Sequence, residues 1–184
     1  GISFTSGNMT GAANIEHTGN ITGGSNSGSD NGQSIGSTSK RYNTVWASVF
    51  NGQATEALYA DLAENYLGDT AYEPGTVVVF GGEAEVTECN GKGDRRVAGV
   101  VTTNPAHLRN SALQGDHVIG LALQGRVPCK VIGQIAKGDM IVTSGVPGHG
   151  MVNNTPGFGE VIGKAVGTKQ DEGHGTVEIV VGRV

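Results

Sequence analysis

The sequence predicts an all-β protein in which a glycine-rich fibrous β stalk precedes a compact β-barrel or sandwich domain, with one short helix between them. Two observations support this fold class. Glycine contributes 32 of the 184 residues, far above its usual share of about 7%, and it supplies the positive φ angles that tight turns require. In the second half of the chain, the apolar residues fall in short runs separated by glycine, which is typical of many short strands.

The stalk is predicted over residues 1–53, because the composition there is unlike that of the rest of the chain. Residues 1–39 contain two acidic residues, Glu16 and Asp30, and no lysine or arginine. As an isolated monomer, such a segment cannot bury enough apolar surface to offset its chain entropy. It is therefore either a flexible linker or a segment that becomes ordered by packing against neighbouring copies of itself.

A faint repeat favours the second alternative, an intertwined stalk. Residues 7–11, 14–19 and 20–23 each place one apolar residue beside Asn, Thr and Gly. A unit this small forms no core alone, so its packing must come from stacked partner chains. The even positions from 42 to 50 then carry Tyr, Thr, Trp, Ser and Phe, and Asn51-Gly52 follows. This alternation predicts a strand that ends at a tight turn.

A short helical connector is predicted over residues 54–73. Ala, Leu, Glu and Asp gather between Ala54 and Tyr66 without Gly or Pro, which favours a helix of one to three turns. Asp61 and Glu64 would then share one helical face. Paired carboxylates can serve acid/base chemistry or bind a cation, but a structural role is favoured, since nothing else catalytic accompanies them. The residues expected to pin this connector to the β-domain are Tyr59, Asp61, Leu62, Glu64 and Tyr66.

The compact β-domain is predicted over residues 74–184. Gly125 is interpreted as the tip of a hairpin, and Gly138-Asp139 as a turn that leads into a strand. Many short strands separated by turn signals indicate a sandwich or a closed barrel rather than a parallel α/β sheet. The predicted strands are Thr76–Phe80, Ala84–Glu88, Val97–Thr103, His117–Leu123, Arg126–Ile132, Met140–Thr143, Val161–Val166 and Thr176–Val181.

Charge and residue spacing argue against several classes of function. The formal net charge is −5, and no basic run is longer than Arg95-Arg96, so nucleic acid is not an expected partner. No apolar stretch approaches the roughly 18 residues that span a bilayer, so no membrane insertion is expected. The five histidines are scattered, and Cys89 and Cys129 are far apart. Because these residues lack metal-ligand spacing, no metal-binding residue is predicted. No catalytic or cofactor-binding residue is predicted either, and no cofactor.

The longest irregular stretch of the β-domain covers residues 146–159. A receptor-binding loop would present flat rings and polar amides, on which sugars stack and form directed hydrogen bonds. His149, Asn153 and Phe158 are the candidate receptor-loop residues here. An ordinary surface loop is the favoured alternative.

Several of these segments together resemble a known family. The resemblance is carried by residues 35–52, by Tyr59-Ala60-Asp61-Leu62-Ala63-Glu64-Asn65-Tyr66 and by residues 72–82, and it continues through 96–105 and 123–131. Residues 35–184 resemble the C-terminal region of bacteriophage tail fibre and appendage proteins. They are similar to the phage intramolecular-chaperone or autoproteolytic cleavage domain family. No self-cleaving residue pair of that family is matched to a position in this chain.

The resemblance implies a function and a set of partners. It implies a homotrimer located in the virion, in a phage tail or fibre, and assembled in the host cytoplasm. Expected partners are other virion tail or baseplate proteins. The expected function is structural, with the β-domain trimerising and capping the stalk. Two alternatives stay open: a tip that binds a host-surface glycan receptor, and an autoproteolytic intramolecular chaperone, which is the single enzymatic activity considered.

Overall fold

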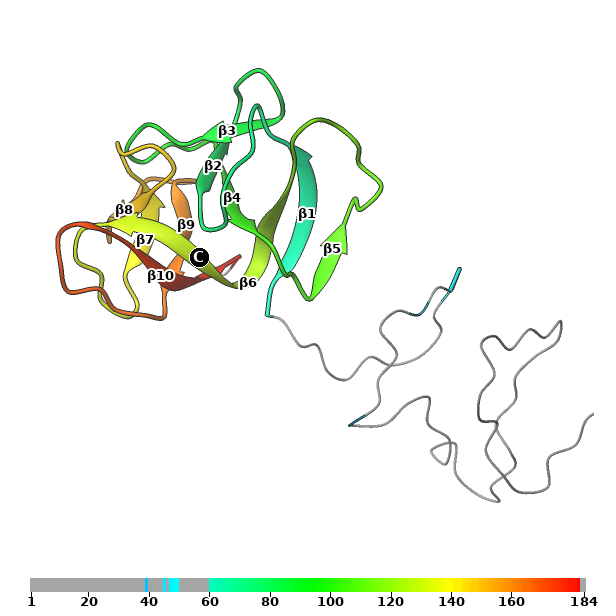
Figure 1. The fold of residues 1–184 in the computed structure, drawn as a ribbon. Helices are drawn as coiled ribbons and strands as arrows, with labels where there is room; N and C mark the ends of the chain where they lie inside the picture. The colour runs from blue at the N-terminus through cyan, green and yellow to red at the C-terminus, as the bar shows by residue number, and fades with distance from the viewer. Residues whose placement is uncertain (1–38, 40–44, 46, 50–59, 183–184) are drawn as a thin grey trace, which may run out of the picture. The chain divides into compact units, whose positions relative to one another are not determined.

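The computed structural model describes residues 39, 45, 47–49 and 60–182 (Figure 1). The chain divides into two compact units, Gly1–Gly52 and Gln53–Val184, and the fold described below belongs to the second. The predicted stalk repeats, most of the predicted strand over residues 35–52, and Tyr59 lie outside the described residues.

The prediction of an all-β fold is confirmed. The described residues contain strands but no helix, so no helix long and apolar enough to cross a membrane is found among them. The strands are β1 (Leu62–Leu67), β2 (Val77–Phe80), β3 (Val86–Glu88), β4 (Val97–Thr102), β5 (His107–Arg109), β6 (Val118–Ile132), β7 (Met140–Thr143), β8 (Gly150–Val152), β9 (Val161–Ala165) and β10 (His174–Val181).

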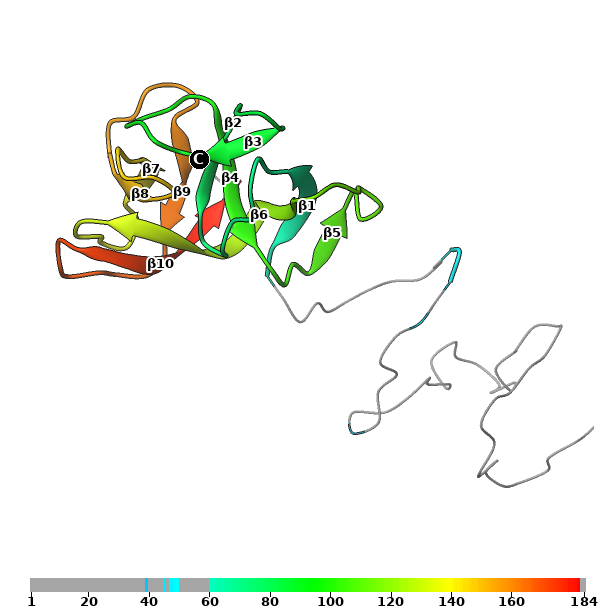
Figure 2. The same cartoon turned by 45° about the horizontal axis from the view of Figure 1, so that its top comes forward.

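Two sheets share the long strand β6 (Figures 1 and 2). Its first half pairs with β1 on one side and β4 on the other, in an open sheet of order β5-β1-β6-β4-β2-β3. Its second half pairs with β10 from Gly125 to Ile132. From β10 the ladder continues through β9, β7 and β8 and returns to β6, which closes a barrel. In both views, β7 to β10 lie on one side of β6, and β1 and β5 lie on the other.

The core follows the alternation of the strands. On the barrel half of β6, Val127, Cys129 and Val131 are buried while Arg126 and Pro128 are exposed, as expected for a strand with one face inward. The main cluster of buried residues takes members from both sheets, so one core is continuous across the junction. A smaller cluster lies in the open sheet. Full burial of each such aliphatic side chain contributes about 1.5–3 kcal/mol.

Both cysteines belong to this core as free thiols. Cys89 and Cys129 are fully buried, and no disulfide joins them. Burial raises the pKa of both thiols, and for Cys129 the proximity of Cys89 adds to the effect. Because the thiolate is the reactive form, both residues act as small apolar side chains in the folded domain.

The predicted connector helix is wrong over its described part. Leu62–Leu67 form strand β1, which pairs in parallel with β5 and antiparallel with β6. The helix was expected from propensity, which differs by less than about 0.7 kcal/mol per residue among these residue types. Hydrogen-bonded ladders along both edges of β1, together with the burial of Ala63, outweigh that preference.

The predicted hairpin at Gly125 is also wrong. The two predicted strands, His117–Leu123 and Arg126–Ile132, merge into one continuous strand, β6 (Val118–Ile132), and Gly125 lies within it with a φ of +106°. Glycine is required here for a second reason. A Cβ atom at this position would overlap the carbonyl oxygen of Ala60 and lie 2.8 Å from the Cα of Asp61. Gly125 thus lets β6 pass from one sheet to the other while the chain that enters β1 crosses directly over it.

Replacing Gly125 with alanine is expected to lower the free energy of unfolding by about 3 kcal/mol or more, because the backbone conformation is strained for an L-residue and the new methyl group meets backbone atoms. Urea denaturation followed by far-UV circular dichroism measures the change.

Gly138→Ala is the matched control. Gly138 has a φ of +91°, but nothing lies within 4 Å of a Cβ built there. The same change should therefore cost only the backbone strain, about 1 kcal/mol. Equal losses in the two variants would contradict the role of Gly125 as a crossing point.

Candidate functional site

Asp61 lies where the chain enters the domain, just before β1. The residue is 4% exposed, and its carbonyl oxygen accepts a hydrogen bond of 2.7 Å from the backbone N–H of Ala106. Its side-chain oxygen Oδ2 is buried and has no hydrogen-bond partner among the described residues. A buried carboxylate oxygen without a donor is costly, which makes Asp61 an unusual residue at this junction.

Of the other predicted connector residues, Leu62, Glu64 and Tyr66 lie along β1, and the shared helical face of Asp61 and Glu64 does not exist. Residues of a strand rise about 3.3 Å each, so these two lie about 10 Å apart along the chain. Glu64 and Tyr66 are two apart on one face of β1. Burial, and next the Glu64 carboxylate, raise the pKa of Tyr66, whose ring packs edge-on against Phe80 at 5.9 Å. Leu62 is half-buried and pairs with both His107 and Gln124.

The predicted receptor-loop residues have different surroundings. Phe158 is 94% exposed, in the turn before β9. Asn153 is half-buried, and its Oδ1 accepts a hydrogen bond of 3.0 Å from the backbone N–H of Thr155, which closes a local turn. His149 and Asn153 flank the two ends of β8, so they lie about 13 Å apart. A receptor role for these three residues stays a prediction.

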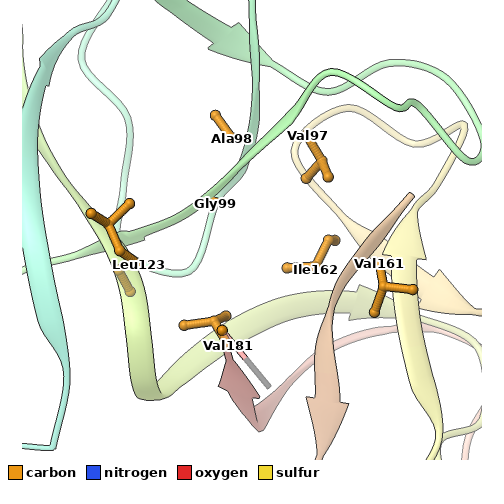
Figure 3. A pocket seen from close by; sticks show the side chains of 9 residues that line it. Val97, Ala98, Gly99, Leu123, Val161, Ile162 and Val181 are labelled. Atoms are coloured by element: carbon orange, nitrogen blue, oxygen red, sulfur yellow. The ribbon is translucent and has the colours of Figure 1, made fainter. Parts of the chain in front are cut away.

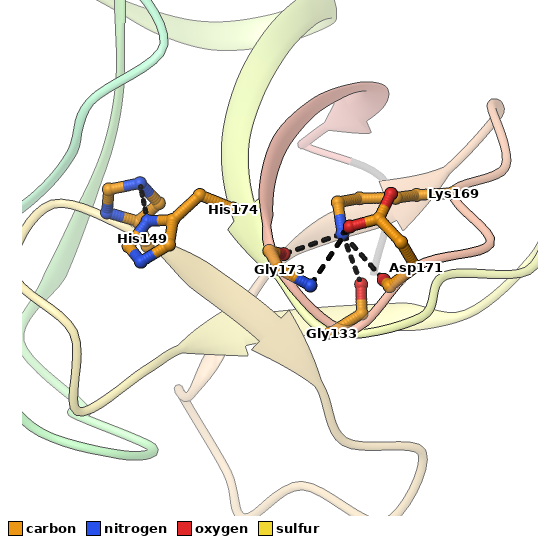
Figure 4. A network of polar contacts seen from close by, with 6 residues as sticks. All are labelled: Gly133, His149, Lys169, Asp171, Gly173 and His174. Atoms are coloured by element: carbon orange, nitrogen blue, oxygen red, sulfur yellow. Dashed lines mark hydrogen bonds and ion pairs between the residues drawn. The ribbon is translucent and has the colours of Figure 1, made fainter.

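His149 instead meets His174, a partner that the sequence did not indicate. Nε2 of His149 lies 3.1 Å from Nδ1 of His174, and the rings meet edge to face with their centroids 4.7 Å apart (Figure 4). His149 belongs to the turn between β7 and β8, and His174 is the first residue of β10. We call these two residues the histidine pair.

A buried lysine lies close along the chain to the histidine pair (Figure 4). Lys169 is 8% exposed. Its ammonium group donates to the carbonyl oxygens of Gly133 (3.3 Å), Asp171 (2.6 Å) and Gly173 (2.6 Å), and to Oδ1 of Asp171 at 2.8 Å. We call this arrangement the lysine clamp. The ammonium group, and next the backbone N–H of Gly173, lower the pKa of Asp171, so that carboxylate is ionised at neutral pH.

The lysine clamp joins segments that are distant in sequence. It ties the loop before β10 to the loop after β6, and the backbone of Lys169 also exchanges two hydrogen bonds of 2.9 Å with Ile135. Nothing in the local sequence Gly167-Thr168-Lys169-Gln170-Asp171 marks this lysine as buried. Lysine is almost never fully buried unless it is paired, and its partners here are mostly backbone carbonyls, which leave no trace in side-chain patterns.

Two hollows open on the domain. An apolar hollow of about 100 Å³ lies where the open sheet meets the barrel (Figure 3). A larger one, of about 530 Å³, has Lys92 and Glu172 among its lining residues. The first is lined by Val97, Ala98, Gly99, Ala122, Leu123, Val161, Ile162, Val181 and Gly182. Since all of these residues are apolar or glycine, the first hollow offers only backbone groups to orient a polar ligand.

Among the described residues, no group of three or more His, Cys, Asp or Glu side chains could together hold a metal ion. Three features remain as candidates for a functional site. They are Asp61 at the entrance of the domain, the exposed ring of Phe158, and the histidine pair beside the lysine clamp.

Replacing Lys169 with methionine keeps most of the side-chain volume but removes the donor. Three carbonyl oxygens then lose their partner, and we expect the free energy of unfolding to fall by about 2 kcal/mol. Urea denaturation at pH 7 measures the loss.

Lys164→Met is the control for this change, because Lys164 is an exposed residue of β9. Exposed substitutions usually change stability by less than about 0.5 kcal/mol. A Lys169→Met variant as stable as this control would show that the clamp contributes nothing.

No model of a known protein family matches the chain, and no curated protein matches it. A function must therefore be inferred from the chain's own residues and contacts.

Proposed function

We propose that the chain is a structural component of a bacteriophage tail fibre or a similar virion appendage, in which its β-domain trimerises and caps a glycine-rich stalk. In this proposal the protein is located in the virion, is assembled in the host cytoplasm and contacts other tail or baseplate proteins. The resemblance of residues 35–184 to phage appendage proteins supports it, as does the composition of residues 1–39.

The observation that carries the proposal is the position of β1. The chain that follows residue 60 does not join the domain at a sheet edge, but enters between β5 and β6. Six residues of β1 pair with β6, and three pair with β5. Asn65 and Asn110 add reciprocal bonds, each side-chain amide donating to the other's carbonyl, at 3.3 Å and 3.1 Å.

This arrangement suits a domain that ends a stalk. Any load carried by the preceding segment reaches the domain through β1, and a strand hydrogen-bonded along both edges is held more firmly than an edge strand. Asp61 adds the backbone bond from Ala106 at the point of entry. A mere flexible leader would not require so firm an attachment.

Self-association of the β-domain would compensate for the weakness of the stalk, and a trimer is what the resemblance to phage appendage proteins implies. Residues 1–39 are poor in apolar side chains and cannot associate strongly by themselves. A self-associating β-domain would bring three stalks together at high effective concentration, after which their weak contacts can form. The domain then sets the register in which the stalk chains meet.

The native mass of the full chain tests this proposal. Three copies of a chain of 18.7 kDa give a mass of about 56 kDa, which light scattering on a sizing column measures directly. A limited proteolytic cut near Gly52 should then remove the stalk and leave a β-domain that is still trimeric. A monomer across the whole accessible concentration range would overturn the proposal. A trimer that dissociates once the stalk is cut would place the association in the stalk instead.

Self-cleavage is a second candidate function, and Asp61 favours it. Its buried carboxylate has one oxygen without a hydrogen-bond partner among the described residues, and it follows residues 1–52 closely along the chain. Such an oxygen can accept the proton of a water molecule that attacks a nearby peptide carbonyl. Hydrolysis would consume that water and release a carboxylate and an amine, separating the stalk from the domain.

If Asp61 cleaves the chain, purified full-length protein will give two fragments over time on a denaturing gel, and Asp61→Asn will abolish them. Glu64→Gln, a change on the adjacent strand, should leave the fragments unchanged. Intact wild-type chain after prolonged incubation excludes this function and leaves the structural proposal standing.

The receptor-binding alternative rests on Phe158 alone, since His149 and Asn153 are engaged within the domain. A glycan array distinguishes it from the structural role. Binding that is lost in Phe158→Ser would support a glycan-binding tip, whereas binding to no glycan would contradict it.

A further inference from the structure

The two facing nitrogens of the histidine pair have the separation of two metal ligands. His149 and His174 come from different segments, 25 residues apart, yet Nε2 of one and Nδ1 of the other are separated by 3.1 Å. Two imidazole nitrogens bound to one zinc ion at about 2.0–2.1 Å lie about 3.3–3.4 Å apart in a tetrahedral site. At the right angles of octahedral or square-planar sites, the same bond lengths give about 2.9 Å. The observed separation lies between these values.

His149 is held in the orientation and tautomer that a ligand needs. Its Nδ1 lies 2.6 Å from the carbonyl oxygen of Pro147. A carbonyl oxygen can only accept, so Nδ1 carries the proton and Nε2 presents its lone pair toward His174. The backbone is fixed as well, because its N–H donates to Val146 (3.2 Å) and its carbonyl accepts from Ser144 (2.9 Å). Metal-binding histidines almost always donate their second N–H in this way.

His174 is positioned from the opposite side. It opens β10 and pairs with Ile132 of β6. The residue before it, Gly173, gives its carbonyl oxygen to the lysine clamp at 2.6 Å. The backbone is therefore anchored while the side chain is exposed. The ring of His174 can then turn until the lone pairs of its Nδ1 and of His149 Nε2 point at one metal ion.

We propose that the histidine pair binds a divalent transition-metal ion of the zinc, nickel or copper type. The ion would lie between Nε2 of His149 and Nδ1 of His174. To bind the ion, His174 must present the lone pair of Nδ1, so the proton of its ring lies on Nε2 in the bound form. Imidazole nitrogen favours these metals, whereas calcium and magnesium take oxygen ligands.

The protein supplies two ligands, so the remaining positions are open to water. No third His, Cys, Asp or Glu completes a metal cluster within the described residues. Binding is therefore expected to be weaker than at a closed structural site. When bound, the ion ties the turn between β7 and β8 to the start of β10, across the same part of the barrel that the lysine clamp secures.

Isothermal titration of untagged, EDTA-treated full chain with zinc chloride tests the proposal. One zinc ion per chain is expected. His149→Gln and His174→Gln should each weaken its binding at least tenfold, with circular dichroism confirming that the variants fold. His17→Gln and His107→Gln are the matched controls and should bind as wild type does.

A second measurement needs no variant of the pair. In wild-type protein, zinc should shift the NMR ring signals of His149 and His174 and leave those of His107 and His117 in place. Calcium chloride should shift none of them. An absence of zinc binding, or binding that persists in both His149→Gln and His174→Gln, overturns the proposal and reduces the pair to an imidazole–imidazole hydrogen bond.

Discussion

Strand β6 holds the domain together, because it is a member of two sheets at once. Over Val118–Ile132 it gives its first half to β1 and β4 and its second half to β10 and β8. The barrel closes on this strand, and the open sheet is built outward from it. Both core clusters draw residues from it. A break in β6 would therefore separate the two sheets and the core that spans them.

This shared strand explains why particular small or polar residues are needed away from any site. Gly125 is required because β6 changes sheet where the entering chain crosses it. Lys169 is buried because its ammonium group joins the loop after β6 to the loop before β10 through their carbonyl oxygens. Asp61 is buried because the chain that enters β1 packs directly against β6 at Gly125.

The sequence predicted those features that depend on local pattern. The fold class and most strands follow from alternation and glycine spacing, and Met140–Thr143 is found with the predicted bounds. Residues 62–66 were misjudged, since their helical propensity is local whereas the pairing that makes them a strand comes from β6, more than 50 positions away. Gly125 was taken for a hairpin because a positive-φ glycine inside a strand and one at a turn look alike in sequence. The histidine pair and the lysine clamp depend on contacts between separate loops, which no local motif encodes.

The order in which the strands pair also bears on how the chain acquires its structure during synthesis. The first of the described strands, β1, finds both of its partners later in the chain, and the last of them, β10, completes the barrel. Long-range pairings of this kind form slowly, and only once the participating segments exist. Closure of the barrel must therefore wait until the segment up to Val181 has left the ribosome. A product that terminates before β10 cannot complete this domain, so β10 acts as a check that the whole domain has been translated.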